Sequence, residues 1–184
     1  MQTFHIHIKG RVQGVGFRPF VYKLAKSEKL KGWVCNSADG VHIEITTIKG
    51  KAIKFYNACL KSKPHLAVIT DATIHEVSPE YFSDFTIRES SNGNLELNIS
   101  PDFGMCATCL NELNDKNNRR YMYPFITCTD CGPRYSIISQ LPYDRAYTSM
   151  DSFTMCQDCQ NEYDDPWDRR YFSQTNSCDT CGIR

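Results

Sequence analysis

Eight of the ten cysteines lie in the second half of the chain, where they form four C-x2-C pairs. Eighteen residues separate the first pair from the second and the third from the fourth, and the whole set recurs 50 residues later. Neighbouring residues recur in step, including Glu112 with Glu162 and Arg119-Arg120 with Arg169-Arg170. The second half therefore contains a duplicated unit, C-x2-C-x18-C-x2-C, whose spacing is typical of zinc sites.

Each unit supplies the four sulfur ligands of a tetrahedral zinc ion, two on each C-x2-C turn. Four thiolates leave no coordination position for water, so we expect two structural zinc ions rather than a catalytic metal. The spacing leaves open whether the pairs combine within one repeat or between repeats. The predicted ligands are Cys106, Cys109, Cys128 and Cys131 in the first repeat, and Cys156, Cys159, Cys178 and Cys181 in the second.

Two other uses of paired cysteines are weaker alternatives. A disulfide framework needs an oxidising compartment, whereas the start of the chain, Met1–His5, has neither the basic nor the apolar region of a secretory signal. An iron–sulfur cluster fits the duplicated pairs less well than zinc does. The longest apolar run, Leu66–Ile69, is too short to cross a bilayer. We therefore expect a cytoplasmic protein with no membrane contact.

The formal net charge is +0, but the two halves of the chain differ strongly. Residues 1–91 carry thirteen Lys and Arg against eight Asp and Glu, a balance of +5, and residues 92–184 have a balance of −5. We expect two domains with these bounds, joined at the polar stretch near residues 90–94, with finger repeats at about 101–140 and 151–184. The acidic second half argues against nucleic acid as a partner, because phosphate binding needs a basic surface.

The first half has the pattern of a small α+β domain. Alternating apolar and polar residues predict a strand at 4–8, and apolar stripes predict helices at 19–30 and 51–62. Further strands are expected at 32–37, 41–46, 66–69, 72–77 and 82–88, with a turn at 38–40. The order βαββαβ, with one extra strand, predicts a ferredoxin-like sandwich.

The segment from residue 10 to residue 18 is the chemical centre of this half. Gly10, Gly14 and Gly16 allow main-chain N–H groups to converge, and Arg18 adds positive charge at a predicted helix start. This combination favours a phosphate cradle, although it matches neither the P-loop nor the dinucleotide fingerprint. The alternative is a glycine-rich turn between a strand and a helix, with an exposed arginine.

The run Gly10-Arg-Val-Gln-Gly-Val-Gly-Phe-Arg18, followed by Gly32-Trp-Val-x-Asn36, resembles the acylphosphatase signature over about the first 90 residues. This resemblance implies an acylphosphatase-type sandwich that hydrolyses acyl phosphates. It also implies that Arg18 binds the substrate phosphate and that the carboxamide of Asn36 orients the attacking water. The implied substrate cradle is the main chain of Gln13, Gly14, Val15, Gly16 and Phe17, together with Arg18.

The combination of this domain with two cysteine units resembles the N-terminal part of the HypF family of hydrogenase maturation carbamoyltransferases. The segments Val15–Phe20 and Asn118–Tyr135 carry the likeness, which spans nearly the whole chain. It implies a role in making cyanide ligands of hydrogenases from carbamoyl phosphate, with a hydrogenase maturation protein as partner. In that family adenylation and transferase domains follow the fingers, so we interpret the chain as a fragment in which full carbamoyl transfer is not possible.

Two other functions remain as alternatives: a non-catalytic module that binds acyl phosphates, and a zinc-dependent nucleic-acid-binding or regulatory protein. For the arginine pairs we expect partial neutralisation of thiolate charge or ion pairs with Asp115 and Asp165. His5, His7 and His42 lie on the polar side of the predicted strands. We expect them to be solvated or to contact the zinc half rather than to bind a metal.

Overall fold

The structure, a computed structural model of the whole chain, describes residues 1–90 and 99–183. The chain forms two compact units, Met1–Asn98 and Ile99–Arg184. The longest helix that the structure describes has 13 residues, so the described part of the chain contains no candidate membrane span.

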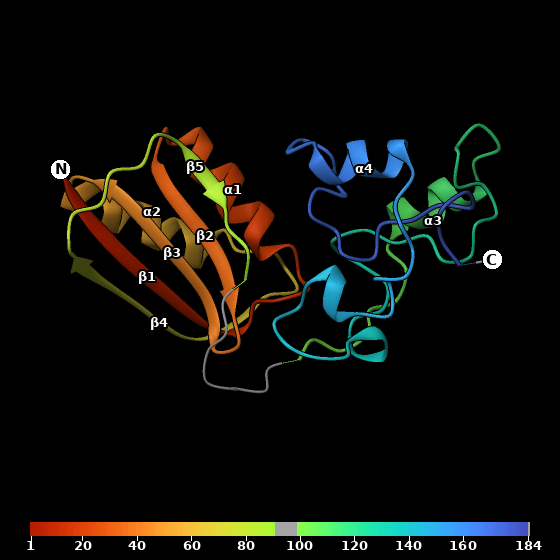
Figure 1. Cartoon of the computed structure of the whole chain (residues 1–184), viewed down its shortest axis with the longest axis horizontal. Helices are drawn as coiled ribbons and strands as arrows, with labels where there is room; N and C mark the ends of the chain where they lie inside the picture. Colours follow the sequence, from red (N-terminus) through yellow and green to blue (C-terminus); the bar gives the residue numbers. More distant parts are fainter. Residues whose placement is uncertain (91–98, 184) are drawn as a thin grey trace. The chain divides into compact units, whose positions relative to one another are not determined.

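The first unit is a five-stranded sheet with two helices against one face (Figure 1). Its elements are, in order, β1 (Gln2–Arg11), α1 (Phe17–Ser27), β2 (Lys31–Ser37), β3 (Gly40–Thr47), α2 (Lys49–Lys61), β4 (Val68–Val77) and β5 (Phe85–Ile87). The strand order is β4-β1-β3-β2-β5, with antiparallel neighbours except for the parallel pair β2–β5. This confirms the predicted ferredoxin-like fold with one extra strand.

The two faces of the sheet differ because side chains alternate along each strand. Apolar residues of β1 and β3, among them Ile6, Ile8 and Ile43, are completely buried on the face that the helices cover. Cys59 of α2 joins this core, where burial raises the pKa of its thiol to about 12. The covered face therefore supplies the hydrophobic core of the unit.

The opposite, open face carries histidines, and these are half-buried by one another rather than solvated. His7 of β1 pairs directly with His42 of β3, and their rings stack with centroids 4.1 Å apart. Burial lowers the pKa of both His5 and His7, and the charge of the neighbouring His42 lowers it further.

One strand differs from the prediction. Residues 66–69 and 72–77 were expected to form two strands, but residues 68–77 form the single strand β4, and residues 66 and 67 precede it. The polar residues Thr70 and Asp71 suggest a break in the sequence, yet they lie opposite an irregularity in β1. There the register shifts between Lys9 and Gly10, and Gly10 adopts a φ of 117°. This bulge accommodates the extra residue of β4, so β4 runs on through Thr70 and Asp71 as one strand.

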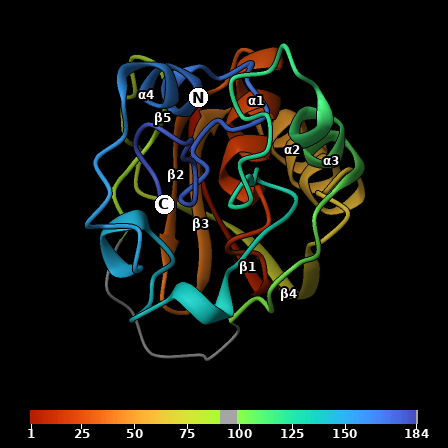
Figure 2. The same cartoon turned by 90° about the vertical axis from the view of Figure 1, so that its right-hand side faces the viewer.

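The second unit contains little regular structure (Figure 2). It has two eight-residue helices, α3 (Ala107–Asn114) and α4 (Gln157–Asp164), and two short 3-10 turns, η1 (Tyr135–Ile137) and η2 (Arg145–Tyr147). Each α-helix begins directly after the first cysteine of its repeat, Cys106 or Cys156. Helices of this length are unstable on their own, so the cysteine clusters must supply much of the order.

Candidate functional site

The loop between β1 and α1 has the backbone of an anion cradle. Gly14 and Gly16 adopt left-handed conformations with φ of 70° and 72°, which other residues rarely adopt. Gly16 is the N-cap of α1, so the loop leads directly into a helix N-terminus. Helix N-termini and alternating left-handed turns present main-chain N–H groups to anions.

The side chains of the loop anchor it. Val15 and Phe17 are buried, with 0% and 1% exposure. The Gln13 side chain donates hydrogen bonds to the main-chain oxygens of Ser37, at 2.6 Å, and Gly40, at 3.3 Å. Gln13 thus ties the loop to the turn between β2 and β3, which follows Ser37, the neighbour of Asn36 in β2. The arrangement leaves the main chain of the loop, rather than its apolar side chains, to contact a ligand.

The two predicted catalytic residues, Arg18 and Asn36, lie in α1 directly after the loop and near the end of β2, respectively. Arg18 is the second residue of α1 and is only 7% exposed, so it is not the exposed arginine of the alternative reading. Its Nη1 donates to the hydroxyl of Ser90 at 3.4 Å.

Asn36 lies in β2 and is 1% exposed. Its Oδ1 is buried and has no hydrogen-bond partner among the described residues. A buried polar atom without a partner costs about 1–3 kcal/mol and in a native protein calls for an explanation, which a bound ligand or water supplies.

The eight cysteines of the second unit form two clusters, one in each repeat. In the first, Sγ–Sγ distances are 3.8 Å for Cys106–Cys128, 3.7 Å for Cys128–Cys131 and 3.5 Å for Cys131–Cys109. The equivalent distances in the second repeat are 3.7, 3.8 and 3.6 Å. A tetrahedral ion with Zn–S bonds of about 2.3 Å separates its ligands by roughly 3.8 Å. The donor set fits zinc, and the pairs combine within each repeat.

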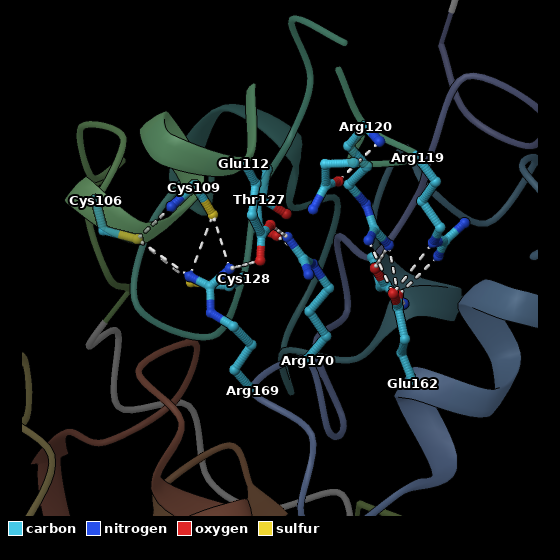
Figure 3. A network of polar contacts seen from close by, with 12 residues as sticks. Cys106, Cys109, Glu112, Arg119, Arg120, Thr127, Cys128, Glu162, Arg169 and Arg170 are labelled. Carbon is cyan, nitrogen blue, oxygen red and sulfur yellow. Dashed lines mark hydrogen bonds and ion pairs between the residues drawn. The ribbon is translucent and has the colours of Figure 1, made fainter. Parts of the chain in front are cut away.

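The paired arginines connect the two repeats reciprocally (Figure 3). Arg169, from the second repeat, donates to Cys106 Sγ at 3.3 Å and to Cys109 Sγ at 3.4 Å in the first. Conversely, Arg119 of the first repeat donates to Cys159 Sγ at 3.1 Å in the second. Each cluster of negative thiolates is therefore neutralised in part by the other repeat.

The second arginine of each pair is itself buried and forms an ion pair across the repeats with a half-buried glutamate. Arg120 donates to Glu162 Oε1 at 2.8 Å, and Arg170 forms the equivalent ion pair with Glu112. Burial alone would raise the pKa of Glu162, but hydrogen bonds from Arg120 and Arg119 outweigh this effect and lower its pKa to about 2.

The expected pairing with Asp115 and Asp165 is wrong. The Oδ1 of each aspartate accepts a hydrogen bond from a main-chain N–H two residues later, of Asn117 and Trp167 respectively. Such short side chains prefer local turns of this kind. The longer Glu112 and Glu162 reach the arginines instead. Glu112 and Glu162 recur at the repeat interval, but Asp115 and Asp165 do so too, so recurrence alone does not distinguish the two pairs.

A buried arginine that sequence reasoning missed also supports the first cluster. Arg134 is 2% exposed, and its Nη2 donates to the main-chain oxygens of Cys128 at 3.0 Å and Thr129 at 3.1 Å. It thereby fixes the second cysteine turn of the repeat. The available signal was a Gly-x-Arg triplet after each last cysteine, although Arg184 lies outside the described residues.

We expect the substitution Arg120→Ala to lower the free energy of unfolding of the metal-loaded second unit by about 3 kcal/mol, the low end for a broken buried pair, because it removes the buried partner and leaves the half-buried Glu162 to the more exposed Arg119. Denaturant unfolding followed by NMR signals of residues 99–183 measures this. Lys116→Ala, at an exposed position, is the control and should change the value by less than about 0.5 kcal/mol. An equally small change for Arg120→Ala would refute the role of this ion pair.

Comparison with known proteins assigns the two units to two known families. The acylphosphatase family model matches residues 4–87, and the HypF finger model matches residues 105–138 and 155–184. Carbamoyltransferase HypF of Synechocystis sp. is 47% identical over 153 residues, which cover 83% of this chain and 20% of that protein. Acylphosphatase of Thermotoga maritima is 40% identical over 89 residues, covering 48% of this chain and 98% of the enzyme.

Among solved structures, full-length HypF in a phosphate- and nucleotide-bound form superposes with a TM-score of 0.94 at 46% identity. The match covers 98% of this chain and 24% of that chain. The chain thus spans about a fifth to a quarter of the length of these HypF proteins. Residues 4–87 belong to the acylphosphatase family, and the chain as a whole is homologous to the N-terminal part of carbamoyltransferase HypF.

Proposed function

We propose that the first unit binds an acyl phosphate, with carbamoyl phosphate as its substrate, and hydrolyses the bond between acyl group and phosphate. The observation that carries this proposal is the left-handed Gly14–Gly16 loop, which leads into α1 with the buried Arg18 on the first helical turn. An arginine on the first turn of a helix, next to the main-chain N–H groups of the helix N-terminus, is a combination that suits a phosphoryl dianion.

In the proposed reaction the phosphoryl group lies in the loop, held by the main-chain N–H groups of residues 13–17. Arg18 stabilises the charge that spreads over the equatorial oxygens as the bond to the acyl group breaks. The carboxamide of Asn36 accepts a hydrogen bond from the attacking water and aligns it; an amide is not basic enough to remove its proton. The leaving carboxylate or carbamate is stable as an anion, so it needs little acid catalysis.

We further propose that each cysteine cluster holds one zinc ion with a structural role. A zinc ion with four thiolates has no open position, and arginines from the other repeat shield the clusters. Because eight thiolates must stay reduced, a reducing compartment such as the cytoplasm fits best. The arginine pairs are engaged with thiolates and glutamates, which argues against their use in binding nucleic acid.

For the longer protein we propose the activity named for its relatives, carbamoyl transfer in hydrogenase maturation. The first unit would then process carbamoyl phosphate, while adenylation and transferase domains and a hydrogenase maturation partner would complete the transfer. An assay of this chain alone with a synthetic acyl phosphate tests the hydrolytic step. Binding without turnover would instead favour a non-catalytic acyl-phosphate-binding module.

The substitution Asn36→Ala should lower kcat for acyl phosphate hydrolysis by about 100-fold and leave KM nearly unchanged, because misplacement of the attacking water affects the chemical step rather than phosphate binding. Steady-state kinetics with benzoyl phosphate measures both constants. Asn57→Ala, on the far surface of α2 and exposed, is the matched control. A rise in KM with an unaltered kcat would show that Asn36 binds substrate and does not position water.

A further inference from the structure

The open face of the first unit carries a cluster of imidazoles and carboxylates, away from the helix-covered face. β1, β3 and β4 each contribute, because the register aligns His7 with His42, and His5 with both Glu44 and His75. Asp39 reaches the same place from the turn between β2 and β3. The side chains of His5, His7, Asp39, His42 and Glu44 are 17–25% exposed, which is low for the uncovered face of a sheet, whereas His75 at the edge of the cluster is exposed.

Four of these side chains form a continuous chain of polar contacts. Glu44 Oε1 lies 3.2 Å from His5 Nδ1, His5 Nε2 lies 3.0 Å from His42 Nδ1, and His42 Nε2 lies 2.9 Å from Asp39 Oδ1. Each carboxylate therefore occupies one end of the chain, with two imidazoles between them.

A count of the available hydrogens shows that this row of four side chains has one hydrogen too few for its three contacts. Three contacts need three hydrogens, one in each, whereas two uncharged imidazoles carry only one N–H apiece and ionised carboxylates carry none. If His5 donates to Glu44 and His42 donates to His5, the lone pair of His42 Nε2 faces the carboxylate of Asp39 at 2.9 Å. Two acceptors at this distance repel each other unless a proton or a metal ion lies between them.

His7 supplies a third donor atom at the same point. Its Nε2 lies 3.5 Å from Asp39 Oδ2, and its ring stacks on that of His42. Ligand atoms of His7, Asp39 and His42 all lie within 4.8 Å of one another. Ligands around an ion with bonds of about 2.0–2.2 Å are roughly 3–3.5 Å apart, so small adjustments of these side chains would bring all three into contact with one ion.

We propose that His7, Asp39 and His42 bind a divalent transition-metal ion of the zinc class, as a site separate from the two cysteine clusters. Imidazole and carboxylate ligands suit such ions. Binding replaces the contact of 3.2 Å between His7 Nε2 and the main-chain oxygen of Asp39. Three protein ligands leave coordination positions for water or a further ligand, unlike the closed thiolate clusters.

Two further members of the cluster, His5 and Glu44, orient the proposed metal ligand His42. Metal-bound histidines usually donate their other ring N–H to an acceptor that fixes the tautomer and orientation. Here His5 Nε2 accepts from His42 Nδ1, and Glu44 in turn orients His5. The ion would thus take the place of the one hydrogen that this set of contacts lacks while both imidazoles are uncharged.

Calorimetric titration of the full chain with Zn²⁺ at pH 7.5, starting from protein whose cysteine clusters are already saturated, tests the proposal. The wild-type chain should bind one further ion. His42→Ala and Asp39→Asn should abolish this binding, and His5→Gln should weaken it by about 10–100-fold. His65→Ala, at an exposed histidine outside the cluster, is the control and should bind the further ion like the wild type.

A second measurement uses only the wild-type chain, so misfolding of a variant cannot affect its result. In the unaltered chain, with zinc in the two cysteine clusters only, added Co²⁺ should broaden the ring NMR signals of His7 and His42 before that of His65. The proposal is overturned if the wild type binds no further Zn²⁺ ion, or if the cluster variants bind it as tightly as His65→Ala does. It is equally overturned if Co²⁺ broadens the His65 signal first.

Discussion

The substitution Arg18→Ala is expected to lower kcat/KM for a synthetic acyl phosphate by about 10²–10³-fold, the usual loss for a group that stabilises developing charge. Arg18 is buried on the first turn of α1, directly after the glycine loop, and at a buried position attraction to a phosphoryl group is weakened less by water than at the surface. Arg18→Lys should recover only part of the loss, because an ammonium lacks the planar fork that binds two oxygens.

Steady-state kinetics with benzoyl phosphate, combined with circular dichroism to confirm folding, measures this effect. Arg88→Ala is a suitable control because Arg88 stacks on Trp33, 4.7 Å from its ring centroid, and is about half exposed. Its activity should stay within about twofold of the wild type. Equal activity of Arg18→Ala and the wild type would remove Arg18 from the site.

Metal removal should unfold the second unit and spare the first. Structural zinc contributes an apparent 10–16 kcal/mol to the folding of small finger domains. The described part of the second unit has only two α-helices, each of eight residues, so it has little other structure to keep it folded without metal. After treatment with a strong chelator, amide signals of residues 99–183 should collapse to the narrow range of unfolded chains. Those of residues 1–90 should persist, because that unit has its own hydrophobic core.

The contacts of each repeat's arginines with the other repeat's cysteines also predict that the two zinc sites depend on each other. Arg169 of the second repeat contacts the thiolates of Cys106 and Cys109 in the first, so the clusters are not independent. Cys109→Ser should therefore release zinc from the first cluster and also weaken zinc binding at the second. Cys59→Ser, in the core of the first unit, is the control and should retain both ions. Metal analysis that finds an unweakened second site would show that the repeats fold separately.

The parts of the structure that follow from local pattern could be predicted from the sequence. Alternation along β1 and β3 reflects a sheet with one buried face, and the spacing of the cysteines reflects the geometry of four-ligand clusters. The repeat at 50 residues also predicted that the two clusters would be built alike. These features depend on residues close in sequence, or on a ligand type with few alternatives.

Features that depend on distant contacts could not be predicted in the same way. Arg120 and Glu162 are 42 residues apart, and nothing local distinguishes this pairing from one with Asp115. The series of side-chain contacts from Glu44 to Asp39 likewise depends on the register of β1 against β3, because the register determines which histidines lie side by side. The buried position of Arg18 was also hidden, because a helix start at a glycine turn is equally compatible with an exposed side chain.

A crystal structure of the chain with inorganic phosphate tests the central claim most directly. We predict a phosphate ion in the loop between β1 and α1, with oxygens about 3 Å from main-chain nitrogens of residues 13–17 and from the Arg18 guanidinium, a normal hydrogen-bond distance. A loop that stays filled by its own side chains at saturating phosphate, with the guanidinium of Arg18 directed elsewhere, would contradict the account.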